Sequence, residues 1–171
     1  ITSIGDTAYL GSEIYGGLGV DPAAEEAALA AWDPETGEVP FELTPVPGAE
    51  VVNTLVATGG SLYGATASGT LFVVDPDAES VVHTAEIASH VGQLVVHRDA
   101  IYGVTADRLI EVDPETYGVE TLLDGLDPHW FNWPMLAIDD VGHAYFLEEY
   151  DLEIAGGLGA LAGDIFRIGC M

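Results

Sequence analysis

Three ionisable residues recur at nearly equal intervals along the chain. Glu50, His90 and His129 are separated by 40 and 39 residues. A carboxylate and two imidazoles that meet in space could bind a cation, transfer protons or accept hydrogen bonds from a ligand. Equal spacing brings such residues together only where the chain is built from repeats of the same length.

The segment around His129 adds flat aromatic rings. Residues 127–134 contain Trp130 and Trp133, two of the three tryptophans, together with Asn132. Aromatic rings of this kind either plug a cleft between structural units or stack on the face of a sugar ring. The sequence leaves both readings open.

An acidic stretch follows in the last quarter of the chain. It contains Glu148, Glu149, Tyr150, Asp151 and Glu153. These acids form either a solvated loop or, with imidazoles, a site for a divalent cation such as calcium or manganese. The candidate ligands for that cation are His90, His129, Glu149 and Asp151. No other cofactor is predicted.

Some of the same residues could support catalysis. In a polysaccharide lyase or hydrolase, His90 or His129 would be the general base, and Glu148 or Glu149 would hold a metal or act as the acid. The sequence contains neither Gly-x-Ser-x-Gly nor His-Glu-x-x-His. Whether the protein is an enzyme is left open.

The chain repeats one pattern, a tyrosine in a short apolar run followed by a second run that ends in Asp-Pro. The Asp-Pro pairs begin at Asp33, Asp75 and Asp113, at intervals of 42 and 38 residues. A period of roughly 40 residues carried by short strands and turns is typical of β-propellers. The aspartates are expected to initiate turns, with calcium binding as the alternative.

We therefore predict an all-β fold of about four propeller blades, each with four antiparallel strands. The predicted blades are approximately residues 1–46, 47–88, 89–127 and 128–171. The last blade is expected to lack its fourth strand, and residues 148–153 to lie in a link between strands. The chain is thus predicted to be part of a larger ring of six to eight blades, closed by further blades or by a partner chain. A ring of four blades alone is the alternative, and it would leave the last blade with three strands.

Blade topology separates two faces. Crossovers between blades leave from one face, together with two glycine-rich links, Gly16-Gly17-Leu18-Gly19 and Gly156-Gly157-Leu158-Gly159. The Asp-Pro turns lie on the other face. The crossover face is predicted to bind a small molecule, with a carbohydrate as the leading candidate. The predicted ligand-binding residues are Glu50, His90, His129, Trp130, Asn132, Trp133 and Tyr150. A scaffold that binds a partner chain at open blade edges is a third alternative.

The second repeat carries a family resemblance. Its Leu62-Tyr63-Gly64 followed by Leu71-Phe72-Val73-Val74-Asp75-Pro76 resembles the repeats of bacterial quinoprotein-like and YVTN-type propellers. The resemblance implies the propeller fold. It does not choose among the lyases, dehydrogenases, lectin-like binders and scaffolds of that superfamily. The glycine and tryptophan signature of quinone-binding repeats is absent, so no quinone is implied.

The composition is strongly acidic. The chain has 3 Lys and Arg residues, all of them Arg, against 29 Asp and Glu, and a net charge of −26. Such a surface repels nucleic acids and anionic membranes and favours cations, neutral ligands or a salty medium. The sequence has no apolar stretch long enough for a membrane span. We expect an extracytoplasmic or secreted location.

Overall fold

The computed structural model describes residues 1–15, 21–126, 135–148, 151–155 and 165–169, and from residue 145 onward it describes only the backbone. The described residues form β-strands and turns, with no α-helix among them. In this part of the chain, no helix is long and apolar enough to cross a membrane.

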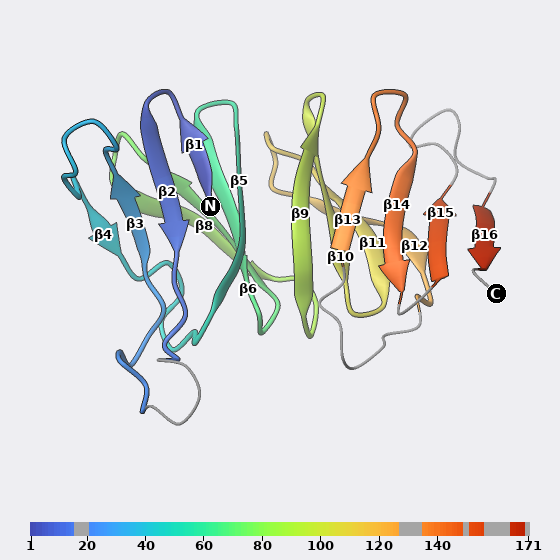
Figure 1. The fold of residues 1–171 in the computed structure, drawn as a ribbon, viewed down its shortest axis with the longest axis horizontal. Coiled ribbons are helices and arrows are strands. Elements are labelled where there is room, and N and C mark those ends of the chain that lie inside the picture. Colours follow the sequence, from blue (N-terminus) through green and yellow to red (C-terminus); the bar gives the residue numbers. More distant parts are fainter. Residues whose placement is uncertain (16–20, 127–134, 149–150, 156–164, 170–171) are drawn as a thin grey trace. The chain divides into compact units, whose positions relative to one another are not determined.

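Sixteen strands form four antiparallel sheets of four strands each (Figure 1). The first sheet contains β1 (Thr2–Ile4), β2 (Thr7–Gly11), β3 (Leu29–Trp32) and β4 (Glu42–Leu43). The second contains β5 (Val52–Thr58), β6 (Ser61–Thr66), β7 (Thr70–Asp75) and β8 (Ser80–Glu86). The third contains β9 (Val91–His97), β10 (Ala100–Thr105), β11 (Arg108–Val112) and β12 (Val119–Asp124). The fourth contains β13 (Met135–Ile138), β14 (Ala144–Glu148), β15 (Asp151–Ala155) and β16 (Ile165–Gly169).

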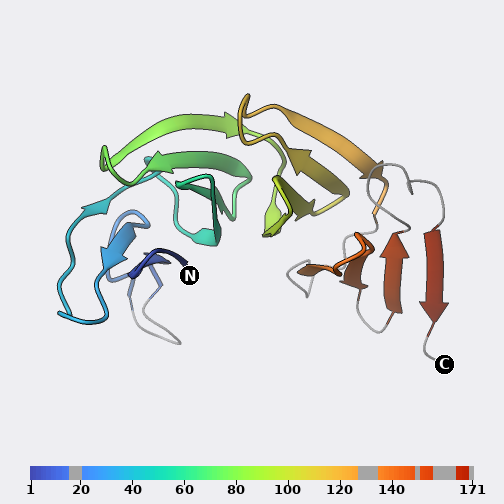
Figure 2. The same ribbon diagram turned by 90° about the horizontal axis from the view of Figure 1, so that it is seen from above.

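Within each sheet the strands follow one another in chain order, from one edge to the other (Figures 1 and 2). This arrangement results from short turns, because antiparallel neighbours need only a few residues to connect them. Gly59 and Gly60, for example, join β5 to β6 with φ angles of 60° and 83°. Each sheet lies inside one of the four predicted blade ranges.

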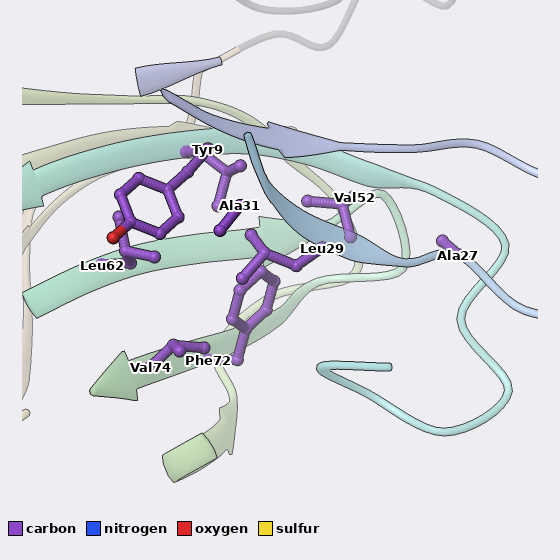
Figure 3. Packing of buried hydrophobic residues seen from close by; sticks show 9 residues of the cluster. Tyr9, Ala27, Leu29, Ala31, Val52, Leu62, Phe72 and Val74 are labelled. Atoms are coloured by element: carbon purple, nitrogen blue, oxygen red, sulfur yellow. The ribbon is translucent and has the colours of Figure 1, made fainter. Parts of the chain in front are cut away.

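The chain divides into two compact units, residues 1–91 and 92–171. In the first unit, the first and second sheets pack face to face. Their shared core joins Tyr9, Leu29 and Ala31 to Leu62 and Phe72. Figure 3 shows the side chains of Leu29 and Phe72 meeting between the two sheets.

The second unit has a core of the same kind between the third and fourth sheets. Tyr102, Val104 and Leu109 pack there with Leu136 and Ala144. In both units the buried residues come mainly from the inner strands, whereas β8 and β12 are largely exposed. The inner strands therefore supply most of the hydrophobic core, and the turns between strands position the polar residues of the candidate sites.

The structure corrects one prediction about the last sheet. Residues 151–155 were expected to lie in a link, but they form β15, which pairs with both β14 and β16. The fourth sheet is therefore complete. The reason is visible in the sequence, because Asp151-Leu152-Glu153-Ile154 alternates acidic and apolar residues, which is the pattern of a strand with one exposed face.

Candidate functional site

Glu50 and His90, two of the predicted ligand-binding residues, belong to the same end of the second sheet. The amide of Ala67 donates to the carbonyl of Val51, the residue after Glu50, at 3.1 Å. The carbonyl of Ala67 is 2.8 Å from Nδ1 of His90. Because a carbonyl can only accept, Nδ1 must carry the proton in this hydrogen bond. Residues 50, 67 and 90 therefore meet at the crossover end of this sheet.

Sequence reasoning missed an aromatic residue at this end. The hydroxyl of Tyr15, which follows β2, donates a short hydrogen bond to the carboxylate of Glu50. The amide of Ile14 also donates to the Glu50 carbonyl, at 3.0 Å, and Glu13 forms a β-bridge with Val51. The loop that carries the ring is thus hydrogen-bonded to the crossover that carries the carboxylate.

The Tyr15 ring is exposed, with 51% of its surface accessible. Its hydrogen bond to Glu50 is the main cause that raises the pKa of the phenol above its ordinary value, with burial and the charges of Glu50 and Glu13 adding to it. The hydroxyl therefore stays protonated and donating, while the ring face remains open to a ligand. The signal that could have identified Tyr15 is its position beside the Gly16-Gly17-Leu18-Gly19 link, which was assigned to this face.

The remaining predicted site residues lie either outside the described part of the chain or at the ends of β14 and β15. Outside the described residues lie His129, Trp130, Asn132, Trp133, Glu149 and Tyr150. Glu148 ends β14, and Asp151 begins β15 rather than lying in a link; the two are backbone partners in the β14–β15 pair. Among the residues that the structure describes, no group of three His, Cys, Asp or Glu side chains could hold a metal ion.

The Asp-Pro turns have a structural role. The carboxylate of Asp33 accepts from the amides of Glu35 and Thr36 and from the Thr36 hydroxyl. Asp113 accepts from the amides of Glu115 and Thr116 in the same way, at 2.7 and 3.2 Å. These hydrogen bonds lower the pKa of both carboxyls. The prediction that these aspartates initiate turns is confirmed.

A cavity lies on the turn side of the third sheet, the side opposite its crossovers. Its volume is about 600 Å³. The residues around it belong to the β9–β10 turn, the β11–β12 turn and the loop before β14. They are His97, Arg98, Asp99, Ala100, Tyr102, Glu111, Asp113, Pro114, Glu115 and Gly142. The ligand that the sequence suggests on this side is calcium, as the alternative role of the Asp-Pro aspartates, and Asp113 is one of them.

Comparison with known proteins supports the fold of the chain but does not assign it to a family. No family model and no curated protein sequence matches the chain. Among solved structures, it is similar to Sqt1 of Saccharomyces cerevisiae, a WD40 propeller, with a TM-score of 0.60 and 11% sequence identity. The similarity covers 72% of this chain and 37% of Sqt1, so the chain spans well under half of that protein. The sheets of this chain are therefore β-propeller-like, and membership of the YVTN-type group stays a prediction.

Proposed function

We propose that this chain is a ligand-recognition module of propeller blades and that its ligand is a carbohydrate bound on the crossover face. The observation that carries this proposal is the pairing of Tyr15 with Glu50. An exposed aromatic ring beside a carboxylate is the combination of groups that a sugar requires, because its apolar face stacks and its hydroxyls donate.

The hydrogen bonds around Tyr15 support this role. The bond to Glu50 holds the ring in place, so little side-chain freedom is lost when a ligand stacks on it. One oxygen of the Glu50 carboxylate accepts the phenol, and an ionised carboxylate keeps acceptor sites for ligand hydroxyls on its other oxygen. His90 adds an imidazole at the same end of the unit.

The net charge of the protein favours a neutral sugar over an anionic one. At −26, the protein repels polyanionic glycans over the range of the Debye length. A neutral oligosaccharide has no such penalty. Trp130, Asn132 and Trp133 stay predicted ligand-binding residues, as further stacking and amide groups. A secreted location would give the module access to such sugars.

We further propose that the four sheets are blades of a ring with six to eight blades. The match to 37% of a propeller chain supports this proposal, whereas the completed fourth sheet removes the argument based on a missing strand. Sedimentation analysis tests it, because a partial ring leaves apolar blade faces that associate with further blades or with a second copy. A strictly monomeric species at all concentrations would contradict it.

A titration with neutral oligosaccharides tests the carbohydrate proposal. Cello-, xylo- and malto-oligosaccharides would be added while tryptophan fluorescence and heat of binding are recorded. Tyr15→Ala should weaken binding about tenfold or more, because an aromatic stacking contact contributes about 0.5–1.5 kcal/mol beyond the area it buries. Glu50→Gln should weaken it as well, since the amide keeps the shape but loses the charged acceptor.

Glu42→Gln is the matched control for the carboxylate. Glu42 is exposed on β4 and belongs to no part of the proposed site. Unchanged affinity in Tyr15→Ala and Glu50→Gln, or affinity lost equally in the control, would contradict the site. Release of new reducing ends or unsaturated sugars during the titration would favour the polysaccharide hydrolase or lyase.

A further inference from the structure

The cavity in the third sheet differs from the equivalent places in the other sheets, and the first difference is in the β9–β10 turn. Arg98 has a left-handed φ of 56° there. The same turn position in the first and second sheets is occupied by Gly5 and Gly59, with φ of 57° and 60°. Glycine adopts this conformation without cost, whereas other residues do not. The third sheet therefore has a charged residue at a turn position where the first and second sheets have glycine.

The second difference lies opposite the repeated tyrosine. Tyr102 pairs across the sheet with Glu111, whereas Tyr9 pairs with Ala31 and Tyr63 with Val73. Burial raises the pKa of the Tyr102 phenol and Glu111 raises it further, whereas Arg98 lowers it, so both charged residues lie near this hydroxyl. A small or apolar position of the repeat has thus become a carboxylate that faces the cavity.

The third difference is at the end of the first strand. His97 ends β9, where Ile4, Thr58 and Ile138 end the equivalent strands. The Nε2 atom of His97 is buried and has no hydrogen-bond partner. It lies against Gly142, since a Cβ added to that glycine would be 3.8 Å away. A buried polar atom without a partner is costly, and a ligand that donates to it would remove that cost.

The charges around the cavity indicate what that ligand is. Four carboxylates, Asp99, Glu111, Asp113 and Glu115, surround one guanidinium. Asp113 is occupied by the amides of its own turn. The acceptors that remain around the cavity are Asp99, Glu111, Glu115 and Nε2 of His97. A ligand with several N–H donors and a positive charge fits this set.

From these observations we propose that the cavity between the β9–β10 turn, the β11–β12 turn and Gly142 binds an alkylammonium group. The ammonium would donate to Glu111 and to Nε2 of His97, while Asp99 and Glu115 add charge at the entrance. A net charge of −26 steers cations toward the protein and anions away from it. The site is independent of the proposed sugar face, because it lies in the other unit and at the other end of its sheet.

Two sources could supply this chemical group, a free polyamine or the side chain of a lysine in a protein. Calorimetric titration of the full chain with spermidine, and separately with the peptide acetyl-Ala-Lys-Ala-amide, distinguishes them at a physiological salt concentration. Saturable binding of one equivalent by either probe supports the proposal and identifies the source. Absence of saturable binding by both probes would overturn it.

Variants locate the binding. Glu111→Gln and His97→Phe should each weaken binding of the probe about tenfold at a similar side-chain volume. The first removes the negative charge of an acceptor, and the second removes the Nε2 acceptor. Glu86→Gln removes one charge from β8, outside the cavity, and should change the affinity less than twofold. Equal affinities in all three variants would mean that the cation only condenses on an acidic surface, which would overturn the proposal.

Arg98→Gly tests the ammonium site even if Glu111→Gln and His97→Phe fold poorly. The replacement removes the positive charge from the cavity and installs the residue that the turn prefers. Binding of an ammonium should therefore become severalfold tighter, whereas an anionic ligand would bind more weakly. A melting curve recorded beside each titration shows that the variant is folded. Weaker spermidine binding by a folded Arg98→Gly protein would refute the assignment.

Discussion

Replacing Gly64 by alanine should destabilise the protein through its core. Gly64 lies in β6 and is the direct backbone partner of Leu55 on one side and Phe72 on the other. A Cβ at this position would overlap the ring of Phe72 and lie 2.8 Å from Cδ2 of Leu55. The ring of Phe72 is fully buried, so it has no space into which to move.

The expected magnitude follows from two opposing effects. Overpacking a filled core costs about 1–3 kcal/mol. Alanine also restricts the unfolded chain, which returns about 0.4–1 kcal/mol. Because the added Cβ would overlap the buried Phe72 ring, the overpacking cost lies in the upper half of its range, and the net loss in the free energy of unfolding is about 1–2.5 kcal/mol. For a chain of this length, each kcal/mol lowers the melting temperature by about 2–4 °C.

Urea and thermal denaturation of matched variants measure this loss. Gly103→Ala is the comparison, because the atoms nearest to its added Cβ, Leu94 Cδ2 at 2.8 Å and Ile110 Cγ1 at 3.1 Å, are farther away than the Phe72 ring is from a Cβ at Gly64. It should cost less than Gly64→Ala. Adding Phe72→Leu to Gly64→Ala should destabilise by less than the sum of the two single changes. An unchanged melting temperature, or strict additivity in the double variant, would refute the packing argument.

Three further predictions concern single polar residues. Arg98→Gly should raise the free energy of unfolding by about 1 kcal/mol, because a left-handed conformation costs a residue with a side chain about that much; a stability loss in chemical denaturation would contradict it. The ionised Asp33, whose folded-state pKa is lowered, contributes stability that is present above about pH 4 and is lost as the pH falls through the folded pKa. Urea midpoints of Asp33→Asn and the parent should therefore differ more at pH 6 than at pH 2, and an equal difference at both would exclude the charge as the cause. Glu50→Gln should lower the raised pKa of Tyr15 toward its ordinary value, and an ultraviolet difference titration of the phenol that shows no change would contradict the hydrogen bond.

The strands of the middle repeats could be predicted closely because turn residues mark their ends. The tyrosine-containing apolar runs of the second and third repeats form β6 and β10, Ser61–Thr66 and Ala100–Thr105. The glycines and the Asp-Pro pairs require turn conformations, whatever the tertiary structure. In the last quarter of the chain, acidic residues were interpreted as a loop although they alternate with apolar ones, and β15 was missed for that reason.

The candidate sites were harder to predict because they depend on distances between turns. The position of Glu50 at a crossover could be inferred from the repeat period. Its hydrogen bond with Tyr15 could not, since it depends on how the residues after β2 return to the crossover. From the sequence alone, His97 is interpreted as a structural residue because it lies on a predicted strand, directly after the apolar run Leu94-Val95-Val96. Only the register of the strands shows that it stands at a position that the other sheets give to apolar or small residues.

The repeats themselves separate residues that the fold requires from residues that it does not. The aspartates of the Asp-Pro turns recur, and their carboxylates are occupied by the amides of the turn. Arg98 and Glu111 occur only in the third sheet, and the first and second sheets form the same hairpins without such charges. Arg98 has a left-handed φ that favours glycine, and its guanidinium donates to the carbonyl of Asp140, so the hairpin alone does not account for an arginine at this position.

A variant that gives the third sheet the residues of the second should keep its stability and lose its ammonium site. His97→Thr, Arg98→Gly and Glu111→Val together install the residues found at the equivalent positions in the second sheet. The triple variant should melt at the same temperature as the parent or higher, because the second sheet folds with those residues. It should also lose saturable spermidine binding. If it unfolds instead, the three residues are structural, and their divergence from the repeat carries no functional information.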